Sequence, residues 1–335
     1  MIFQNIVLHN VSELTENGAG GYLLHRFPLS VEQDLIDGGK NANMVSTGVE
    51  FRFRMLSDSV TLKLGYSGKA TSVAIYRGGV LGSWDEVQVP IVGGKINEIA
   101  IKKKCTDELK MINSSAHFAF SEEVVRVVCN SATLSFYGIE GDVLPPEKEQ
   151  LPKKTYLAYG SSITHGSNAV AIPASFAFRV AEHFRTDYYN LGLAGSARME
   201  KSVIDHIAQM GEDGKWDFAT VCMGINVLAM EEREFRSRVR YTVETISSKN
   251  LEKHIFFISP IFCNADMTGD RRAARWREIV GEETLRKASD FVHYINGLEL
   301  LGGAHGLSGD YVHPSPLGID EITSKLIAKI SEFVG

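Results

Sequence analysis

Residues 155–166 of the chain read Thr-Tyr-Leu-Ala-Tyr-Gly-Ser-Ser-Ile-Thr-His-Gly. The first part is a compact apolar run typical of a buried β-strand, and Gly160 then lets the chain turn close against its neighbours. Ser162 follows that turn, where backbone N–H groups can face developing negative charge. Serines also cap and turn chains without any chemical role, so both interpretations stay open for this stretch alone. A phosphate-binding loop is excluded, because no Gly-Lys-Ser/Thr follows.

The sequence beyond this stretch alternates between strand-like and helix-like segments. Expected strands cover residues 155–160, 188–191, 218–223, 254–259 and 291–295. Expected helices cover residues 174–184, 199–210, 231–248, 271–289 and 317–334. Such alternation implies right-handed crossovers and a doubly wound parallel sheet. In these sheets the active site lies at the carboxyl ends of the strands.

The preceding residues, 1 to about 145, have a different pattern. Short runs such as Val49–Met55 and Val60–Leu64 alternate apolar and polar residues, and Gly-Gly pairs punctuate later runs. This pattern predicts an antiparallel β-sandwich, with no helix expected. The proline-bearing, charged stretch 144–152 is typical of a linker. We therefore expect one domain over residues 1–147 and a second over residues 153–335.

Two further strand ends carry residues suited to binding an oxyanion. Gly195 follows the second strand, and its N–H is unobstructed by a side chain, although a flexible turn explains it equally well. Asn226 follows the third strand in Met223-Gly224-Ile225-Asn226. Its side chain either caps a helix or aims its NH2 group at an oxyanion.

An Asp-x-x-His pair precedes the last expected helix. Asp310 and His313 are close enough in sequence for a turn to bring both side chains to one side. A carboxylate bonded to one imidazole nitrogen fixes the tautomer, and the other nitrogen can then take a proton from a serine. A turn with a capping Asp and half of a metal site are the alternatives, but the metal site lacks a clear third ligand. The order of these residues, three of them after successive strands and two before the last helix, favours one shared site. They are Ser162, Gly195, Asn226, Asp310 and His313.

Residues of about 153 to 335 resemble the SGNH (GDSL-type) hydrolase superfamily, whose four conserved blocks supply Ser, Gly, Asn and His. The matching segments are Gly160–Thr164, Asn190–Gly195, Gly224–Asn226 and Asp310 with His313. The resemblance implies a three-layer, flavodoxin-like parallel sheet, here preceded by a jelly-roll-like β-sandwich. It also implies Ser162 as nucleophile, Asp310 and His313 as its partners, and an oxyanion hole. The hole would comprise the N–H groups of Ser162 and Gly195 and the side chain of Asn226.

One residue departs from the family pattern. Ser161 stands where the family usually has Asp. That Asp is not the catalytic acid, so we expect activity to survive its replacement.

These observations predict a serine esterase that cleaves a carboxylic ester, with an acetyl ester of a carbohydrate as the leading substrate. The alternatives are an acyltransferase with the same triad and a non-catalytic carbohydrate-binding protein, although a binding protein has no need of the complete set. The sandwich either holds a carbohydrate, shapes one wall of the cleft, or only packs. We expect neither a metal nor an organic cofactor. Other candidate pocket or cleft residues, for which surface or supporting roles are at least as good an interpretation, are His165, Asn168, Arg198, Tyr311, His25, Arg26 and Trp84.

The composition limits the remaining possibilities. The chain has 335 residues, a formal net charge of −6 and no basic stripe, so we expect no nucleic-acid partner. No stretch approaches the roughly 20 apolar residues of a membrane helix. No signal peptide is visible at the N-terminus, which favours a cytoplasmic location. The four dispersed cysteines, Cys105, Cys129, Cys222 and Cys263, are expected to be free thiols. The oligomeric state stays open.

Overall fold

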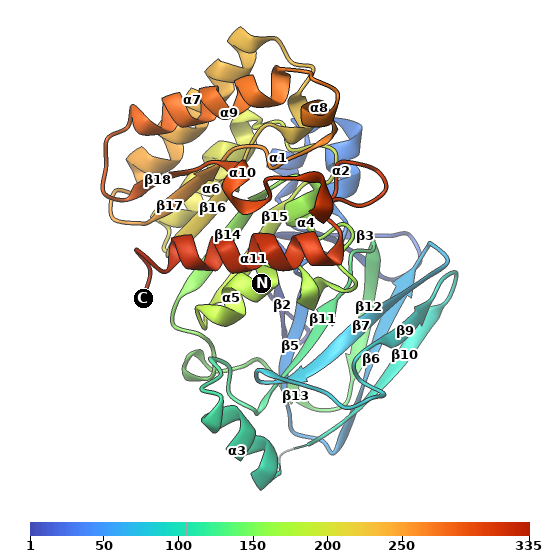
Figure 1. Ribbon diagram of the computed structural model, residues 1–335. Helices are drawn as coiled ribbons and strands as arrows, with labels where there is room; N and C mark the ends of the chain where they lie inside the picture. The colour runs from blue at the N-terminus through green and yellow to red at the C-terminus, as the bar shows by residue number, and fades with distance from the viewer. Residues whose placement is uncertain (105) are drawn as a thin grey trace. The chain divides into compact units, whose positions relative to one another are not determined.

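The computed structural model describes residues 1–104 and 106–335 (Figure 1). Contacts divide the chain into two compact units. The sandwich unit comprises Met1–Leu29, Asn43–Lys153 and Arg185–Asp187, and the sheet unit comprises Ser30–Ala42, Lys154–Phe184 and Tyr188–Gly335. Each unit therefore includes a short segment from the other side of the expected linker. The domain boundaries at residues 147 and 153 stay a prediction.

The sandwich unit contains two antiparallel sheets, as the period-2 runs predict. One sheet has eight strands: β1 (Ile2–Phe3), β2 (Ile6–His9), β5 (Glu50–Met55), β11 (Val124–Cys129), β7 (Ala70–Arg77) and β8 (Val80–Leu81) in order, with β13 (Val143–Leu144) on β5 and β9 (Val89–Val92) on β7. The other has five, in the order β10 (Ile96–Lys102), β6 (Ser59–Tyr66), β12 (Leu134–Glu140), β4 (Tyr22–His25) and β3 (Glu13–Glu16).

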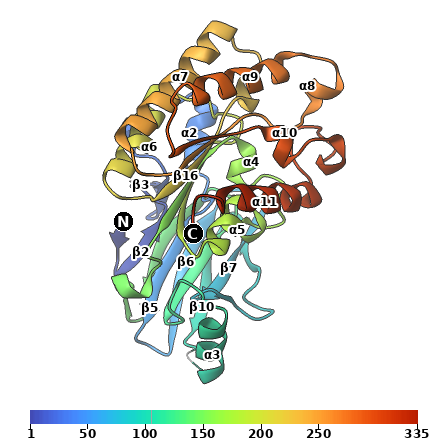
Figure 2. The same ribbon diagram turned by 60° about the vertical axis from the view of Figure 1, so that its left-hand side comes forward.

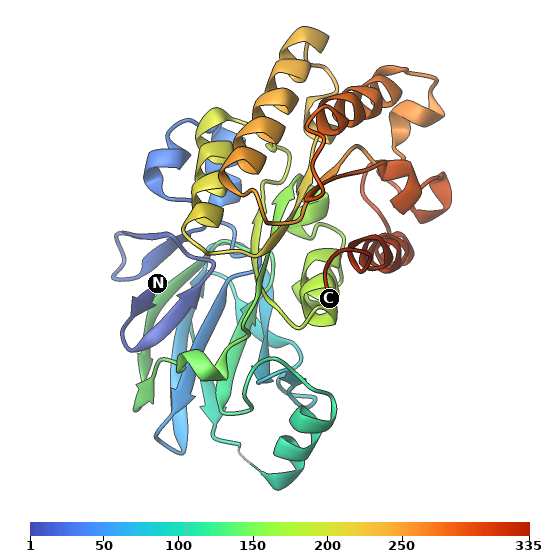
Figure 3. The same cartoon turned by 90° about the vertical axis from the view of Figure 1, so that its left-hand side faces the viewer.

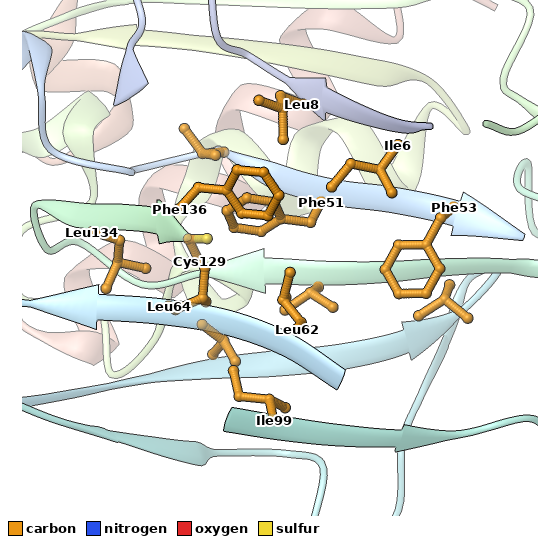
Figure 4. Packing of buried hydrophobic residues seen from close by; sticks show 14 of the residues in the cluster. Ile6, Leu8, Phe51, Phe53, Leu62, Leu64, Ile99, Cys129, Leu134 and Phe136 are labelled. Carbon is orange, nitrogen blue, oxygen red and sulfur yellow. The ribbon is translucent and has the colours of Figure 1, made fainter. Parts of the chain in front are cut away.

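The core of the sandwich unit is built from alternate residues of both sheets. Phe51 and Phe53 of β5 pack with Leu62 and Leu64 of β6 and with Phe136 of β12 (Figure 4). All five side chains are fully buried. Burial of one such side chain stabilises a fold by about 1.5–3 kcal/mol, so this cluster accounts for much of the pairing between the sheets.

The expectation that the first part of the chain holds no helix is wrong. Three helices form there: α1 (Leu29–Glu32), α2 (Asp37–Asn43) and α3 (Asp107–Ser115). The side chain of Thr106 caps α3 by accepting a hydrogen bond from the backbone N–H of Leu109 at 3.2 Å. Asp107 and Glu108 add favourable negative charge in the first turn. All three helices are short, and α3 begins at a local cap, which apolar periodicity does not reveal.

The sheet unit is a doubly wound α/β structure around a five-stranded parallel sheet, which confirms the predicted fold. When its strands are numbered by their order in the sequence, they lie side by side in the sheet in the order 2-1-3-4-5. This is the flavodoxin-like arrangement. The strands, in spatial order, are β15 (Asp187–Gly192), β14 (Thr155–Gly160), β16 (Phe218–Cys222), β17 (Ile255–Ile258) and β18 (Val292–Ile295). Helices cover both faces, so β17 is apolar and buried throughout its length.

The five long predicted helices are present within a few residues of their expected ends. They are α5 (Phe176–His183), α6 (Lys201–Glu212), α7 (Glu232–Lys249), α9 (Arg272–Leu285) and α11 (Pro316–Ile330). α6, α7 and α9 pack in succession, whereas α5 and α11 pack together elsewhere on the unit (Figures 2 and 3). The strands end beside shorter elements, including α4 (Ser162–His165), that carry the predicted site residues.

Two other predictions concern the whole chain. None of the helices formed by residues 1–104 and 106–335 has the length and apolar character required to span a bilayer. Cys129, Cys222 and Cys263 are free thiols, as predicted. Cys105 lies outside the described residues.

Candidate active site

Ser162 is the first residue of α4, directly after the turn that ends β14. Gly160 makes this turn possible: a Cβ atom there would lie 2.3 Å from Thr164 Oγ1 and 2.8 Å from Cys222 Cβ. Ser161 caps α4, since its Oγ accepts a hydrogen bond from the Ile163 N–H at 3.3 Å. Serine and aspartate both serve as N-caps, which explains how Ser161 fits where the family usually has Asp.

The structure brings Ser162, His313 and Asp310 into one hydrogen-bonded line. His313 Nε2 lies 2.6 Å from Ser162 Oγ, and His313 Nδ1 lies 2.6 Å from Asp310 Oδ2. An ionised carboxylate only accepts hydrogen bonds, so the Asp310 contact places the imidazole proton on Nδ1. Nε2 is therefore left as an acceptor for the Ser162 hydroxyl. This is the arrangement of a nucleophile, its base and the group that orients the base.

Asp310 is held as a carboxylate by its own turn. Oδ1 accepts backbone N–H bonds from His313 at 2.9 Å and Val312 at 3.0 Å, and a hydroxyl bond from Ser308 at 2.9 Å. The N–H groups of His313 and Val312 lower the pKa of Asp310 well below its ordinary value. The tight turn places Tyr311 at a φ of 61°, which is uncommon for a bulky residue.

On the other side of the site, Asn226 has a fixed orientation. It lies in the short helix η3 (Ile225–Val227) after β16, and its Oδ1 accepts a hydrogen bond from the Ala197 N–H at 3.1 Å. The Nδ2 group is thereby left to donate elsewhere. Gly195, on the Ala197 loop, has a φ of +67°, a conformation that glycine adopts without strain.

Several other residues named from the sequence have structural roles. His165 is buried, and its Nδ1 lies 3.0 Å from the carbonyl oxygen of Gly192. His25 and Arg26 are buried within the sandwich unit, where Arg26 Nε donates to the Val45 carbonyl at 2.8 Å. These three side chains are therefore unsuited to lining an open cleft. Trp84, in contrast, is 99% exposed.

Asn168 and Ser308 form a chain of hydrogen bonds to Asp310 that the sequence did not indicate. Asn168 Nδ2 donates to Ser308 Oγ at 2.9 Å, and Ser308 in turn donates to Asp310. The sequence suggested Asn168 only as a pocket residue, and Ser308 not at all. A serine two residues before an aspartate is a common local arrangement, so Ser308 offered no distinctive signal.

An apolar cavity lies beside the turn that carries Ser162 in the sheet unit. Its volume is about 40 Å³, and its lining includes Ile163, Ile225, Ile258, Ile322 and Leu326. A single water occupies about 10–15 Å³ on this measure, so the cavity has room for a group of a few heavy atoms. Cys222 also contacts the cavity, and burial raises the pKa of its thiol to about 12. Across the described part of the chain, no group of His, Cys, Asp and Glu is arranged to hold a metal ion.

The sequence profile of the GDSL-like lipase/acylhydrolase family matches residues 153–331, more than half of the chain. The chain belongs to this family. Membership of the GDSL-like lipase/acylhydrolase family makes the protein an ester-hydrolysing enzyme. No curated protein matches the chain by sequence comparison.

Solved structures share the fold of this chain over 87–99% of its length. The salicylyl-acyltransferase SsfX3 from a tetracycline biosynthetic pathway is 15% identical, with a TM-score of 0.79 over 99% of this chain and 96% of that one. A putative GDSL-like lipase from Bacteroides ovatus is 20% identical, with a TM-score of 0.68 over 98% and 97%. A family two carbohydrate esterase from Clostridium thermocellum, an active-site mutant, is 13% identical, with a TM-score of 0.61 over 87% and 93%.

Proposed function

We propose that the protein is a serine esterase that releases a short acyl group from an ester, using Ser162 as nucleophile. The observation that carries this proposal is the hydrogen-bonded line from Ser162 Oγ through His313 to Asp310 Oδ2. Both distances are 2.6 Å, within hydrogen-bond reach for proton transfer. A serine nucleophile, its base and the group that orients the base require this arrangement.

The residues divide the reaction between them. His313 Nε2 takes the Ser162 hydroxyl proton while Ser162 Oγ forms a bond to the ester carbonyl carbon, and Asp310 stabilises the imidazolium. The Ser162 N–H, the Gly195 N–H and the Asn226 NH2 donate to the resulting oxyanion. The intermediate then expels the alcohol, which receives the proton from His313. Water attacks the acyl-enzyme by the same route, and the acid and free Ser162 are released.

The cavity beside the nucleophile turn supports a short acyl group. Ile163 and Ile225, which line it, are the chain neighbours of Ser162 and Asn226. A cavity of about 40 Å³ with apolar walls has room for an acyl group of a few carbon atoms. The family two carbohydrate esterase with the same fold motivates a sugar as the alcohol portion. A carbohydrate ester as partner and a cytoplasmic location stay predictions.

The test compares wild type with Ser162→Ala on p-nitrophenyl acetate, butyrate and octanoate. We expect wild type to turn over the acetate and butyrate, and the variant to lose this activity. A serine-directed fluorophosphonate should label wild type only. Equal turnover by the two proteins would refute Ser162 as nucleophile, and a preference for octanoate would refute the short acyl group.

An acyltransferase is the second candidate, favoured by the fold shared with SsfX3 over 99% of this chain. The same acyl-enzyme would then be attacked by an acceptor alcohol in place of water. Product analysis with and without an added sugar alcohol separates the two reactions. Ester formation that outcompetes hydrolysis at millimolar acceptor would establish transfer.

A further inference from the structure

We propose that Asn168 and Ser308 are a pair of positioning residues that hold Asp310 and His313 against the nucleophile turn. This inference rests on the proposed function, because it assigns a role within the Ser162 site. Neither residue belongs to the hydrogen-bonded line itself. They act through Asp310, and their contacts reach it from a segment next to Ser162.

The direction of the hydrogen bonds follows from the donor groups. Asn168 Nδ2 has only hydrogens to offer, so Ser308 Oγ is the acceptor at 2.9 Å. The Ser308 hydroxyl hydrogen is then available for Asp310 Oδ1, also at 2.9 Å. A chain of donors thus runs from the Asn168 amide through the Ser308 hydroxyl to the carboxylate. Such chains polarise their members and strengthen each bond.

Asn168 is tied to the nucleophile turn through the backbone. The Ser162 carbonyl accepts bonds from the N–H groups of Gly166 at 3.0 Å and Ser167 at 2.9 Å. Asn168 follows directly, with a φ of 64° in the left-handed region that asparagine tolerates better than most residues. The position of its amide therefore depends on where the Ser162 turn lies.

Ser308 is tied to the Asp310–His313 turn in the same manner. Its N–H donates to the His313 carbonyl at 2.8 Å, and its own carbonyl accepts the Tyr311 N–H at 3.0 Å. Two compact turns, one carrying Ser162 and the other carrying His313, are thus joined by the Asn168–Ser308 bond as well as by the Ser162–His313 bond. The Asn168–Ser308 bond does not involve the proton that moves between Ser162 and His313.

This second link has a specific chemical consequence. Oδ1 of Asp310 receives its bonds from the turn and from Ser308, which leaves Oδ2 directed at His313 Nδ1. Without the link, the His313 turn can shift relative to Ser162 while its internal bonds remain. A misplacement of about 1 Å costs about 100-fold in rate, so we expect Asn168→Ala and Ser308→Ala each to lower kcat by about 10- to 100-fold.

The kinetic test uses p-nitrophenyl acetate with Asn168→Ala, Ser308→Ala and the double variant. We expect kcat to fall, KM to change little, and the double variant to be no slower than the worse single variant, because both changes break one link. Ser308→Thr, which keeps the hydroxyl, should restore most activity. Ser324→Ala is the matched control, since Ser324 Oγ donates within α11, to the Asp320 carbonyl at 2.9 Å. Full activity in both single variants would overturn the inference.

A second measurement separates this inference from the proposed function. The Nδ1 proton of a histidine bonded to a carboxylate gives a far-downfield NMR signal, which does not depend on turnover. We expect wild type to show this signal from His313. In both single variants the signal should broaden because the proton exchanges with water, while the melting temperatures stay close to that of wild type. An unchanged sharp signal in both variants would overturn the positioning role even if the protein hydrolysed no ester. Loss of activity in Ser162→Ala, a lowered kcat in both single variants and the expected change in the signal would together support both proposals.

Discussion

Asn226 Oδ1 accepts a hydrogen bond from the backbone N–H of Ala197 at 3.1 Å. This bond joins the loop after β15 to the loop after β16, and it determines which end of the Asn226 amide faces Ala197. Because the oxygen faces Ala197, the NH2 group is the end left to donate to a ligand. The two loops that carry the proposed oxyanion donors are thereby coupled.

Replacing Asn226 should therefore reduce turnover without preventing folding. We expect Asn226→Ala to lower kcat by about 100- to 1,000-fold, the usual effect of losing one oxyanion donor. Asn226→Asp retains an acceptor for the Ala197 N–H but has no NH2 group and adds negative charge beside the oxyanion. Its kcat should be at least as low as that of Asn226→Ala. Steady-state kinetics on p-nitrophenyl acetate test both, and near-wild-type turnover by Asn226→Asp would rule out the donor role.

The pH dependence of activity follows from the state of Asp310. Its pKa is lowered, so the carboxylate interaction is fully present above the ordinary aspartate value of about 4 and is lost only as pH falls through the lower folded value. Asp310 is therefore ionised above about pH 4, and its own protonation should not limit activity there. We expect log kcat/KM to fall on the acid side with a slope no steeper than one above about pH 4, because Asp310 adds no second proton there. A slope of two above about pH 4 would contradict this assignment.

The long elements of the sheet unit were predictable because their signals extend over many residues. β17, for example, is a continuous apolar run, and α5 has apolar residues at helical spacing. The strand-end positions of Ser162 and Asn226 follow from that topology. α3, in contrast, is defined by the Thr106 cap and a few acidic residues, so a search based on periodicity passes over it.

The missed parts of the site depend on contacts between distant segments. Asn168 and Ser308 are separated by 140 positions, and no pattern near either residue indicates the other. His165 is the opposite case, in which the structure decides between two open interpretations. A histidine three positions after Ser162 suggests a pocket residue, yet the fold buries it against the Gly192 carbonyl. The size of the apolar cavity likewise results from how α11 packs, which sequence pattern does not specify.

Enlarging that cavity should change the preferred acyl length. Leu326 is fully buried on α11 and lines the cavity, so Leu326→Ala should raise activity on the butyrate relative to the acetate. Ile319 is buried on the same helix but does not line the cavity, which makes Ile319→Ala a matched control. Both should destabilise the fold by about 2–5 kcal/mol. The cavity has no role in acyl binding if the two variants have the same chain-length profile.

Two glycines near the site should respond differently to an added methyl group. At Gly160 the new Cβ would meet Thr164 and Cys222 at 2.3 and 2.8 Å, so Gly160→Ala must displace the turn that carries Ser162. At Gly195 no atom lies within 4 Å, but the φ of +67° is unfavourable for alanine.

We expect Gly195→Ala to cost about 1–2 kcal/mol of unfolding free energy through backbone strain. Gly160→Ala should cost about 1–3 kcal/mol through overpacking and should also lower kcat, because the Ser162 turn moves. Urea unfolding and steady-state kinetics measure the two effects separately. If Gly160→Ala kept wild-type kcat despite the clash, the close approach of Gly160 to Thr164 would have no part in placing the nucleophile.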